Sequence, residues 1–126
     1  MKLLATTAAA LLITTAAAHA DTGRIPSSLQ GAWCPTARAD HYRSGHCAND
    51  IHVTANGYAI AAHSHALRQC TLTASFRERT ALLADFDCTG AEKVSMRMHK
   101  HRNGQLHMWA SDASAASKVA RVANAQ

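Results

Sequence analysis

Four cysteines constrain the fold of this 126-residue chain more than any other feature of its sequence. They are Cys34, Cys47, Cys70 and Cys88. An even number of cysteines in a short chain is typical of an exported domain that is held together by disulfides. None of them forms the Cys-x-x-Cys pair that is found in zinc ribbons and thiol oxidoreductases, so we predict two disulfides.

The two later cysteines flank a predicted β-hairpin. Residues 70–76 and 82–88 each alternate apolar and polar side chains, which is the pattern of half-buried strands. The charged residues 77–80 between them are typical of a turn. We expect Phe76 to face Leu82, because this register sets every apolar pair of the hairpin on one face.

The same register places Cys70 opposite Cys88. Facing residues on antiparallel strands have Cα atoms roughly 4.5–5.5 Å apart, which is within the reach of a disulfide. We therefore predict the disulfide Cys70–Cys88, which leaves Cys34–Cys47 as the second. A disulfide that closes a loop of the length between Cys34 and Cys47 stabilises a small domain by on the order of 3 kcal/mol.

The first twenty residues have the pattern of a cleavable secretory signal. Lys2 is their only charged residue, an apolar run of Leu, Ile, Ala and Thr follows, and Ala18-His19-Ala20 ends the segment with the small residues that a signal peptidase recognises. We predict cleavage after Ala20 and a periplasmic or secreted mature protein. No second apolar run follows, so we expect no transmembrane segment in the mature chain.

Further short strands are predicted within the mature domain, residues 21–111. Asn56-Gly57 is a hairpin signal, and with these two residues as the turn Val53 faces Ile60. Short strands at close spacing favour an all-β fold, a small antiparallel meander or barrel of about six strands with two disulfides. We expect residues 112–126, which are rich in Ala and Ser, to form a flexible or short helical tail.

The last predicted hairpin, around Asn103-Gly104, is rich in Met and His, and its register decides what these residues can do. A two-residue turn places four candidate copper ligands on one face, since thioether and imidazole groups suit Cu(I). These residues are Met96, Met98, His107 and Trp109. The set resembles that of the periplasmic copper-binding β-barrel chaperones, which use two Met, one His and a capping Trp, and the resemblance implies a copper site.

A three-residue turn that ends at a left-handed Gly104 exchanges the two faces of this hairpin. Met98 then joins an apolar face. On the polar face His99 lies opposite His107, with His101 beside them, and two or three imidazoles there are candidate ligands of Zn²⁺ or Cu²⁺. We favour this register, because it separates apolar from polar side chains more completely.

The charge and the motifs of the chain argue against several functional classes. The formal net charge is +5, from 13 basic and 8 acidic residues, and the basic residues are scattered along the chain. The sequence contains no nucleic-acid-binding motif, no Gly-x-Ser-x-Gly nucleophile elbow and no phosphate-binding loop. We therefore predict a protein that is not an enzyme and that does not bind nucleic acid.

The segment 40–47, tethered by the predicted Cys34–Cys47 disulfide, is the strongest candidate for a recognition surface. Tyr42, Arg43 and His46 are its candidate binding residues, since Tyr and Arg in particular anchor protein interfaces, and a constrained loop loses less entropy on binding. In the alternative interpretation Tyr42 packs on the core and the loop is structural.

Three short motifs resemble those of a group of small exported two-disulfide proteins of alphaproteobacteria. With the two later cysteines they span roughly residues 29–90, and they are Leu29-Gln30-Gly31-Ala32-Trp33-Cys34, Tyr42-Arg43-Ser44-Gly45-His46-Cys47 and the segment from Val53 to Gly57-Tyr58. The resemblance implies a location in the cell envelope and a β fold, and it implies no mechanism.

Two functional hypotheses follow from the sequence. The first is a non-enzymatic binding or interaction module of the cell envelope, which needs no cofactor and whose partner is a protein or another envelope component. The second is a periplasmic protein that binds copper or zinc through its Met- and His-rich hairpin.

Overall fold

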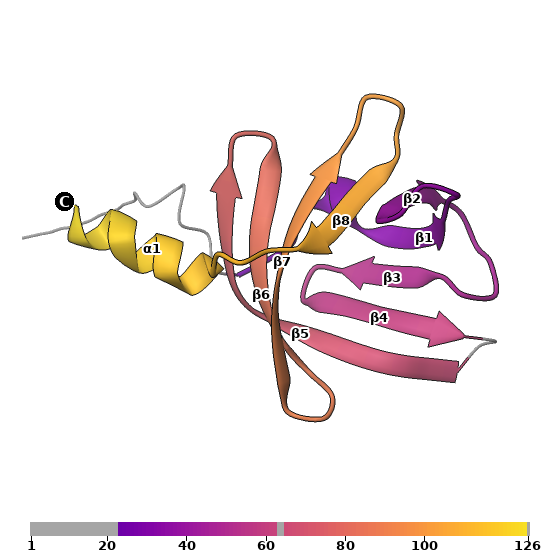
Figure 1. Cartoon of the computed structure of the whole chain (residues 1–126), viewed down its shortest axis with the longest axis horizontal. Helices are drawn as coiled ribbons and strands as arrows, with labels where there is room; N and C mark the ends of the chain where they lie inside the picture. Colours follow the sequence, from indigo (N-terminus) through magenta and orange to yellow (C-terminus); the bar gives the residue numbers. More distant parts are fainter. Residues whose placement is uncertain (1–22, 63–64, 126) are drawn as a thin grey trace, which may run out of the picture.

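Eight antiparallel strands close into a barrel (Figure 1). This computed structural model describes residues 23–62 and 65–125, so the predicted signal peptide lies outside the described residues. The strands are β1 (Gly31–Pro35), β2 (His41–Ser44), β3 (Ile51–Thr54), β4 (Gly57–Ala62), β5 (His65–Glu78), β6 (Ala81–Cys88), β7 (Glu92–Lys100) and β8 (Leu106–Ala110). A 3-10 helix, η1 (Ser27–Leu29), precedes them, and an α-helix, α1 (Ala115–Asn124), follows. The predicted antiparallel all-β fold is confirmed, and it is a closed barrel.

The barrel is a six-strand meander closed by a hairpin. Strands β3 to β8 are neighbours in sequence order, and the β1–β2 hairpin joins their two ends, because β1 pairs with β3 and β2 pairs with β8. The described strands therefore number eight rather than about six. The sequence predicts a loop at residues 40–47, but β2 lies there; it is only four residues long and has one apolar side chain, Tyr42, which is too little for a strand pattern.

Large apolar side chains fill the barrel interior. Phe86 is 1% exposed, and its ring meets that of Tyr58 edge to face, with ring centroids 4.8 Å apart. Trp33 belongs to the same buried cluster, and its Nε1 donates a hydrogen bond to the carbonyl oxygen of Leu29 at 3.0 Å, which ties η1 to β1. Within the described ranges, no helix combines the length and the hydropathy needed to span a bilayer.

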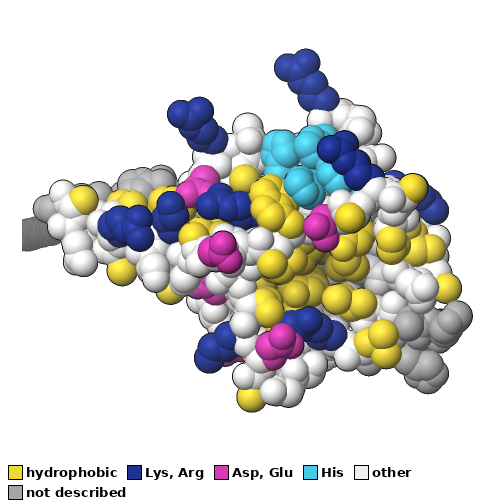
Figure 2. All heavy atoms as spheres, viewed as in Figure 1, with side chains coloured by type: hydrophobic (Ala, Val, Ile, Leu, Met, Phe, Trp, Pro, Cys, Tyr) yellow, Lys and Arg dark blue, Asp and Glu magenta, His cyan; other side chains and the backbone are white. Residues whose placement is uncertain are grey.

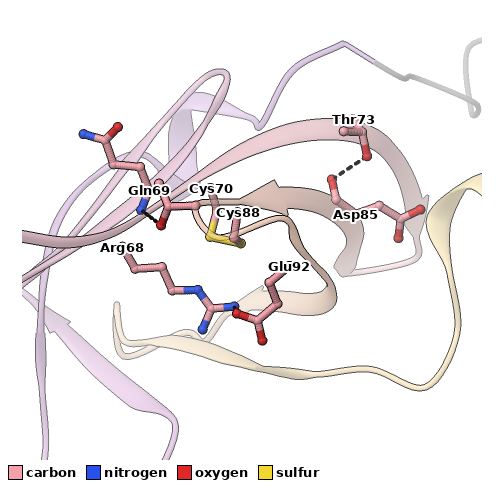
Figure 3. The surroundings of a disulfide bond; sticks show 8 residues. Arg68, Gln69, Cys70, Thr73, Asp85, Cys88 and Glu92 are labelled. Atoms are coloured by element: carbon pink, nitrogen blue, oxygen red, sulfur yellow. Dashed lines mark hydrogen bonds and ion pairs between the residues drawn. A yellow bond between two sulfur atoms is a disulfide. The ribbon is translucent and has the colours of Figure 1, made fainter.

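The two disulfides join the cysteines that the sequence predicts. Cys34–Cys47 links β1 to the segment after β2, with Cα atoms 6.0 Å apart. Cys70–Cys88 joins facing residues of the adjacent strands β5 and β6, as Figure 3 shows. Each disulfide thus fastens a hairpin of the barrel.

The β3–β4 hairpin has a different register from the predicted one. The sequence predicts that Val53 faces Ile60, whereas in the structure Val53 faces Tyr58. The turn begins one residue earlier than expected, at Ala55, and Gly57 is the first residue of β4. A Cβ atom on Gly57 would meet the backbone of β5, so the close approach of that strand, rather than the turn, requires this glycine.

The β5–β6 hairpin follows the predicted register at its cysteine end only. The pairs up to Leu72 are as expected, but a β-bulge after Leu72 shifts the pairing by one residue. Phe76 therefore faces Leu83 and not Leu82. The bulge accommodates a tight two-residue turn, in which Arg79 has a φ of 48°, in place of the longer turn that the predicted register requires.

The shifted register leads to a second apolar cluster outside the barrel. Ala74, Phe76 and Leu83 of the strands face helix α1. Leu83 is fully buried there, and so is Ala115, the first residue of the helix. Strand β6 is therefore buried on both faces near Leu83. The predicted tail, residues 112–126, thus contains a helix that packs against the barrel wall, outside the ring of strands (Figure 1).

Asp85 fastens the start of helix α1 to strand β6. Its carboxylate accepts hydrogen bonds from the backbone amides of Ala115 and Ala116, at 2.7 and 2.9 Å, and from the hydroxyls of Ser95 and Ser114, each at 2.8 Å. Burial by itself raises the pKa of Asp85, but these four donors outweigh it and the pKa is lowered. The charged carboxylate therefore stabilises the docked helix.

We expect Asp85→Ala to lower the free energy of unfolding by on the order of 2 kcal/mol, since it removes a helix cap and leaves partly buried donors without an acceptor. Urea unfolding at pH 7 measures this loss. Because the folded-state pKa is lowered, the contribution of Asp85 is present above the ordinary pKa of an aspartate and disappears as the pH falls through the folded value. Asp87→Ala is the matched control: its exposed ion pair with Lys93 should contribute less than about 1 kcal/mol. Equal losses in the two variants would contradict the capping role.

Candidate metal site

The final hairpin has the three-residue-turn register that the sequence favours. His99 faces His107, and Met98 faces Met108. The amide of Gly104 donates to the carbonyl oxygen of His101 at 3.0 Å, and Gly104 has a φ of 88°, the left-handed conformation that this turn requires. The imidazoles of β7 and β8 therefore share the outer face of the barrel.

The copper site of the alternative register is not formed. Met98 is fully buried in the barrel core, and Met96 packs against the same core cluster. His107 and Trp109 lie on the opposite, outer face, where their rings stack with centroids 3.9 Å apart. Met96 and Met98 are therefore core residues, because the burial of the apolar face sets the register.

Three histidines from separate segments meet on this outer face. Strand β2 pairs with β8 so that His41 faces His107, and His101, the first residue after β7, completes the group. One ligand nitrogen from each ring lies within 4.8 Å of the other two. Figure 2 shows the histidine side chains gathered in one patch, next to Lys and Arg side chains. We call His41, His101 and His107 the tri-histidine cluster.

The tri-histidine cluster is held in place by ring packing. The rings of His41 and His107 stack at 4.2 Å between centroids with an interplanar angle of 13°, and Trp109 stacks on the far side of His107. His41 is only 6% exposed, so its ring is largely shielded from water. The Nε2 atom of His101 is buried and has no hydrogen-bond partner in the described part of the chain.

The surroundings of the cluster favour uncharged imidazoles. Burial lowers the pKa of His41, and electrostatic repulsion by Arg38, followed by that of His101, adds to this effect. Burial also lowers the pKa of His107, followed by the effects of His41 and His101. Asp40 acts in the opposite direction on both but is outweighed. Two of the three rings therefore stay in the neutral form, which is the form that binds metals.

His99, the third histidine of the predicted site, lies beside the tri-histidine cluster and is not part of it. Its Nδ1 atom donates to the carbonyl oxygen of Thr80 at 2.9 Å, which leaves Nε2 as the nitrogen with a free lone pair. Its ring lies edge-on to His101, with centroids 4.7 Å apart. Of the three predicted imidazole ligands, the structure thus brings His101 and His107 together with His41 instead of His99.

The predicted binding loop does not present its three residues as one surface. Tyr42 is half-buried against the barrel core, and burial, followed by the charge of Asp40, raises the pKa of its hydroxyl. Arg43 and His46 are exposed, and His46 lies 4.0 Å from the buried carboxylate of Asp50. Of the two interpretations of Tyr42, the structure has the one in which it packs on the core.

Sequence reasoning missed His41 as a partner of the C-terminal histidines. It lies in a segment that reads as a loop, and its contact with β8 depends on the closure of the barrel. A local signal exists in the alternation of inward Tyr42 with outward His41 and Arg43, but it is too short to predict a strand. Comparison of the chain with protein families, with curated proteins and with solved structures found no match.

Proposed function

We propose that this protein binds Zn²⁺ or Cu²⁺ through the tri-histidine cluster and acts as a metal-binding protein outside the cytoplasm. The observation that carries this proposal is the convergence of three imidazole nitrogens, each within 4.8 Å of the others, from three separate segments. Imidazole is a preferred ligand of both ions. Three protein ligands leave a fourth position of a tetrahedral Zn²⁺ for water or another small ligand.

Binding requires the rings of the tri-histidine cluster to move. Zn–N bonds of about 2.0–2.1 Å place tetrahedral ligand nitrogens roughly 3.4 Å apart, so the three rings have to approach by about an ångström. His41 and His107, which are stacked, must also tilt until both ring planes meet the ion. Because the pKa values of both rings are lowered, little proton release opposes binding at neutral pH.

Two further observations support this form of the proposal. Disulfides persist in oxidising compartments, which agrees with the predicted signal at residues 1–20 and with a periplasmic or secreted location. The interaction-module hypothesis relies on Tyr42, Arg43 and His46, and one of these side chains, Tyr42, packs on the core. Metal binding is therefore the better supported of the two hypotheses.

A titration of the oxidised, metal-free protein tests the proposal. Zn²⁺ at a hundredfold excess over its dissociation constant should raise the free energy of unfolding by about 2.7 kcal/mol. Cu²⁺ should quench the fluorescence of Trp109, which stacks on His107, and Trp109→Phe should lose most of this quenching. His101→Gln should weaken the affinity for both ions at least about tenfold.

His46→Gln is the matched control, because this exposed histidine lies outside the tri-histidine cluster. It should bind both ions as the wild type does. Because the pKa values of His41 and His107 are lowered from the ordinary value of 6.5, protonation of these two rings should weaken binding only below that pH. Absence of stabilisation by either ion, or equal losses in His46→Gln and His101→Gln, would remove the proposal.

A further inference from the structure

A hollow of about 1000 Å³ opens at the end of the barrel where the β5–β6 and β7–β8 turns lie. Figure 1 shows both turns projecting from the same end, opposite the β6–β7 turn. Residues of both turns, of the adjoining strand ends and of η1 line it, with Arg77 and Arg79 near the β5–β6 turn and Lys100 and Arg102 near the β7–β8 turn. We call this hollow the barrel-end pocket.

Positively charged side chains line the barrel-end pocket, and no acidic side chain of the pocket neutralises them. Its four basic side chains are all exposed, and no Asp or Glu lines it. None of the four forms an ion pair with a carboxylate among residues 23–62 and 65–125. Figure 2 shows Lys and Arg side chains projecting at this end of the molecule. Like charges around a concave surface raise the local potential, so the pocket attracts anions.

The strand registers place two of these cations above the apolar core and not on the outer wall. Arg77 faces Leu82, and Leu82 faces Met98 inside the barrel. Lys100 lies two residues after Met98, again at an inward-facing position, with its Nζ atom 6.0 Å from the ring centroid of Trp33. The barrel-end pocket therefore combines a cationic rim with an apolar floor, to which Leu82 contributes.

We propose that the barrel-end pocket binds an amphiphilic organic anion, a molecule in which phosphate, sulfate or carboxylate groups are joined to a compact apolar body. Arginine presents its donors as a planar fork that binds such groups bidentately. The apolar body covers the floor of the pocket and excludes water from it. The volume lies at the upper end of the range of roughly 300–1,000 Å³ that is usual for small-molecule sites. This ligand is independent of the metal site, although His101 borders both.

Calorimetric titration with 1-naphthyl phosphate, in buffer freed of metals on a chelating resin, tests this proposal. We expect binding that weakens as salt is added, because the attraction is electrostatic. Inorganic phosphate and 1-naphthol each carry only one of the two required features, so each should bind at least about tenfold more weakly. Equal binding of 1-naphthol and 1-naphthyl phosphate would overturn the proposal.

Variants locate the site. Arg79→Gln combined with Arg102→Gln should weaken binding of 1-naphthyl phosphate at least about tenfold, which is about 1.4 kcal/mol for two charged contacts. Lys93→Gln combined with Arg121→Gln removes the same charge from residues outside the pocket and should change the affinity less than about threefold. Thermal unfolding confirms that both double variants fold. Equal losses in the two would show that net charge, not the pocket, attracts the ligand.

Vesicles of phosphatidylglycerol and phosphatidylcholine distinguish a lipid headgroup from a free small molecule. Sedimentation with vesicles that 1-naphthyl phosphate prevents would identify the headgroup as the source of the anion. No sedimentation, together with binding of 1-naphthyl phosphate, identifies a free small molecule. Sedimentation with vesicles that 1-naphthyl phosphate does not affect would overturn the proposal. The four basic side chains would then be part of a surface that binds membranes.

Discussion

Replacing Cys70 and Cys88 together by alanine is expected to lower the free energy of unfolding by about 3 kcal/mol. The disulfide joins residues 18 apart in sequence, so its removal restores conformational entropy to the unfolded chain. Both cysteines are also buried, and alanine fills less of the core than the sulfur atoms do. Single domains are stabilised by roughly 5–15 kcal/mol in total, so this is a large fraction. Urea unfolding, followed by far-ultraviolet circular dichroism, measures the loss.

The variant should nevertheless keep the barrel. Strand β6 pairs with residues 70–78 of β5, and the ion pair of Arg68 with Glu92, 2.8 Å long, ties β5 to β7 beside the disulfide (Figure 3). Thr71→Ala, on the exposed face next to Cys70, controls for the change of strand propensity and should alter stability by less than about 0.5 kcal/mol. A double variant within about 1 kcal/mol of the wild type would show that the disulfide contributes little.

Two features of hairpins could be predicted from the sequence, although the register of β3–β4 and that of the turn end of β5–β6 could not. The Cys70–Cys88 pair and the turn at Gly104 both follow from the alternation of apolar residues along two strands of one hairpin. In each case a wrong register moves apolar side chains to the solvent, so burial selects one answer. This is why His101 and His107 were correctly expected on the polar face.

Features that depend on barrel closure could not be predicted in this way. His41 reaches His107 only because β2 pairs with β8, and the local sequence pattern of neither strand indicates this pairing. The barrel-end pocket is likewise formed by two turns that are brought together only when the barrel closes. The sequence analysis thus identified His101 and His107 as candidate ligands, but neither His41 nor the cations of the pocket.

Helix α1 covers a face of β6 that the strand pattern alone predicts to be exposed to solvent. Alternation in β6 predicts one buried face, yet Leu83 on the other face is fully buried because α1 covers it. Asp85 reads as a solvated residue of a polar face, whereas it caps α1. A single-sequence pattern cannot tell a solvent-facing strand from one that is covered by a later helix.

Gly57→Ala is expected to destabilise the barrel by about 3 kcal/mol or more, although it adds a single methyl group. A Cβ atom at this position would lie 2.0 Å from the carbonyl oxygen of Cys70 and 3.2 Å from the Cα atom of Thr71. Both are backbone atoms, so no side-chain rotation relieves the contact, and β4 must move away from β5. That movement would strain the hydrogen bond of 2.8 Å from the Leu72 amide to the Asn56 carbonyl oxygen.

Gly90→Ala separates this steric effect from backbone strain. Gly90 has a φ of 85°, in the left-handed region, but a Cβ atom there has no neighbour within 4 Å. We therefore expect a loss of only about 1–2 kcal/mol, the cost of a left-handed alanine. Chemical unfolding of both variants under the same conditions makes the comparison. A smaller loss for Gly57→Ala than for Gly90→Ala would mean that β4 and β5 do not approach as closely as the fold requires, and the register that leads from Gly57 through Cys70 to Cys88 would then have to be revised.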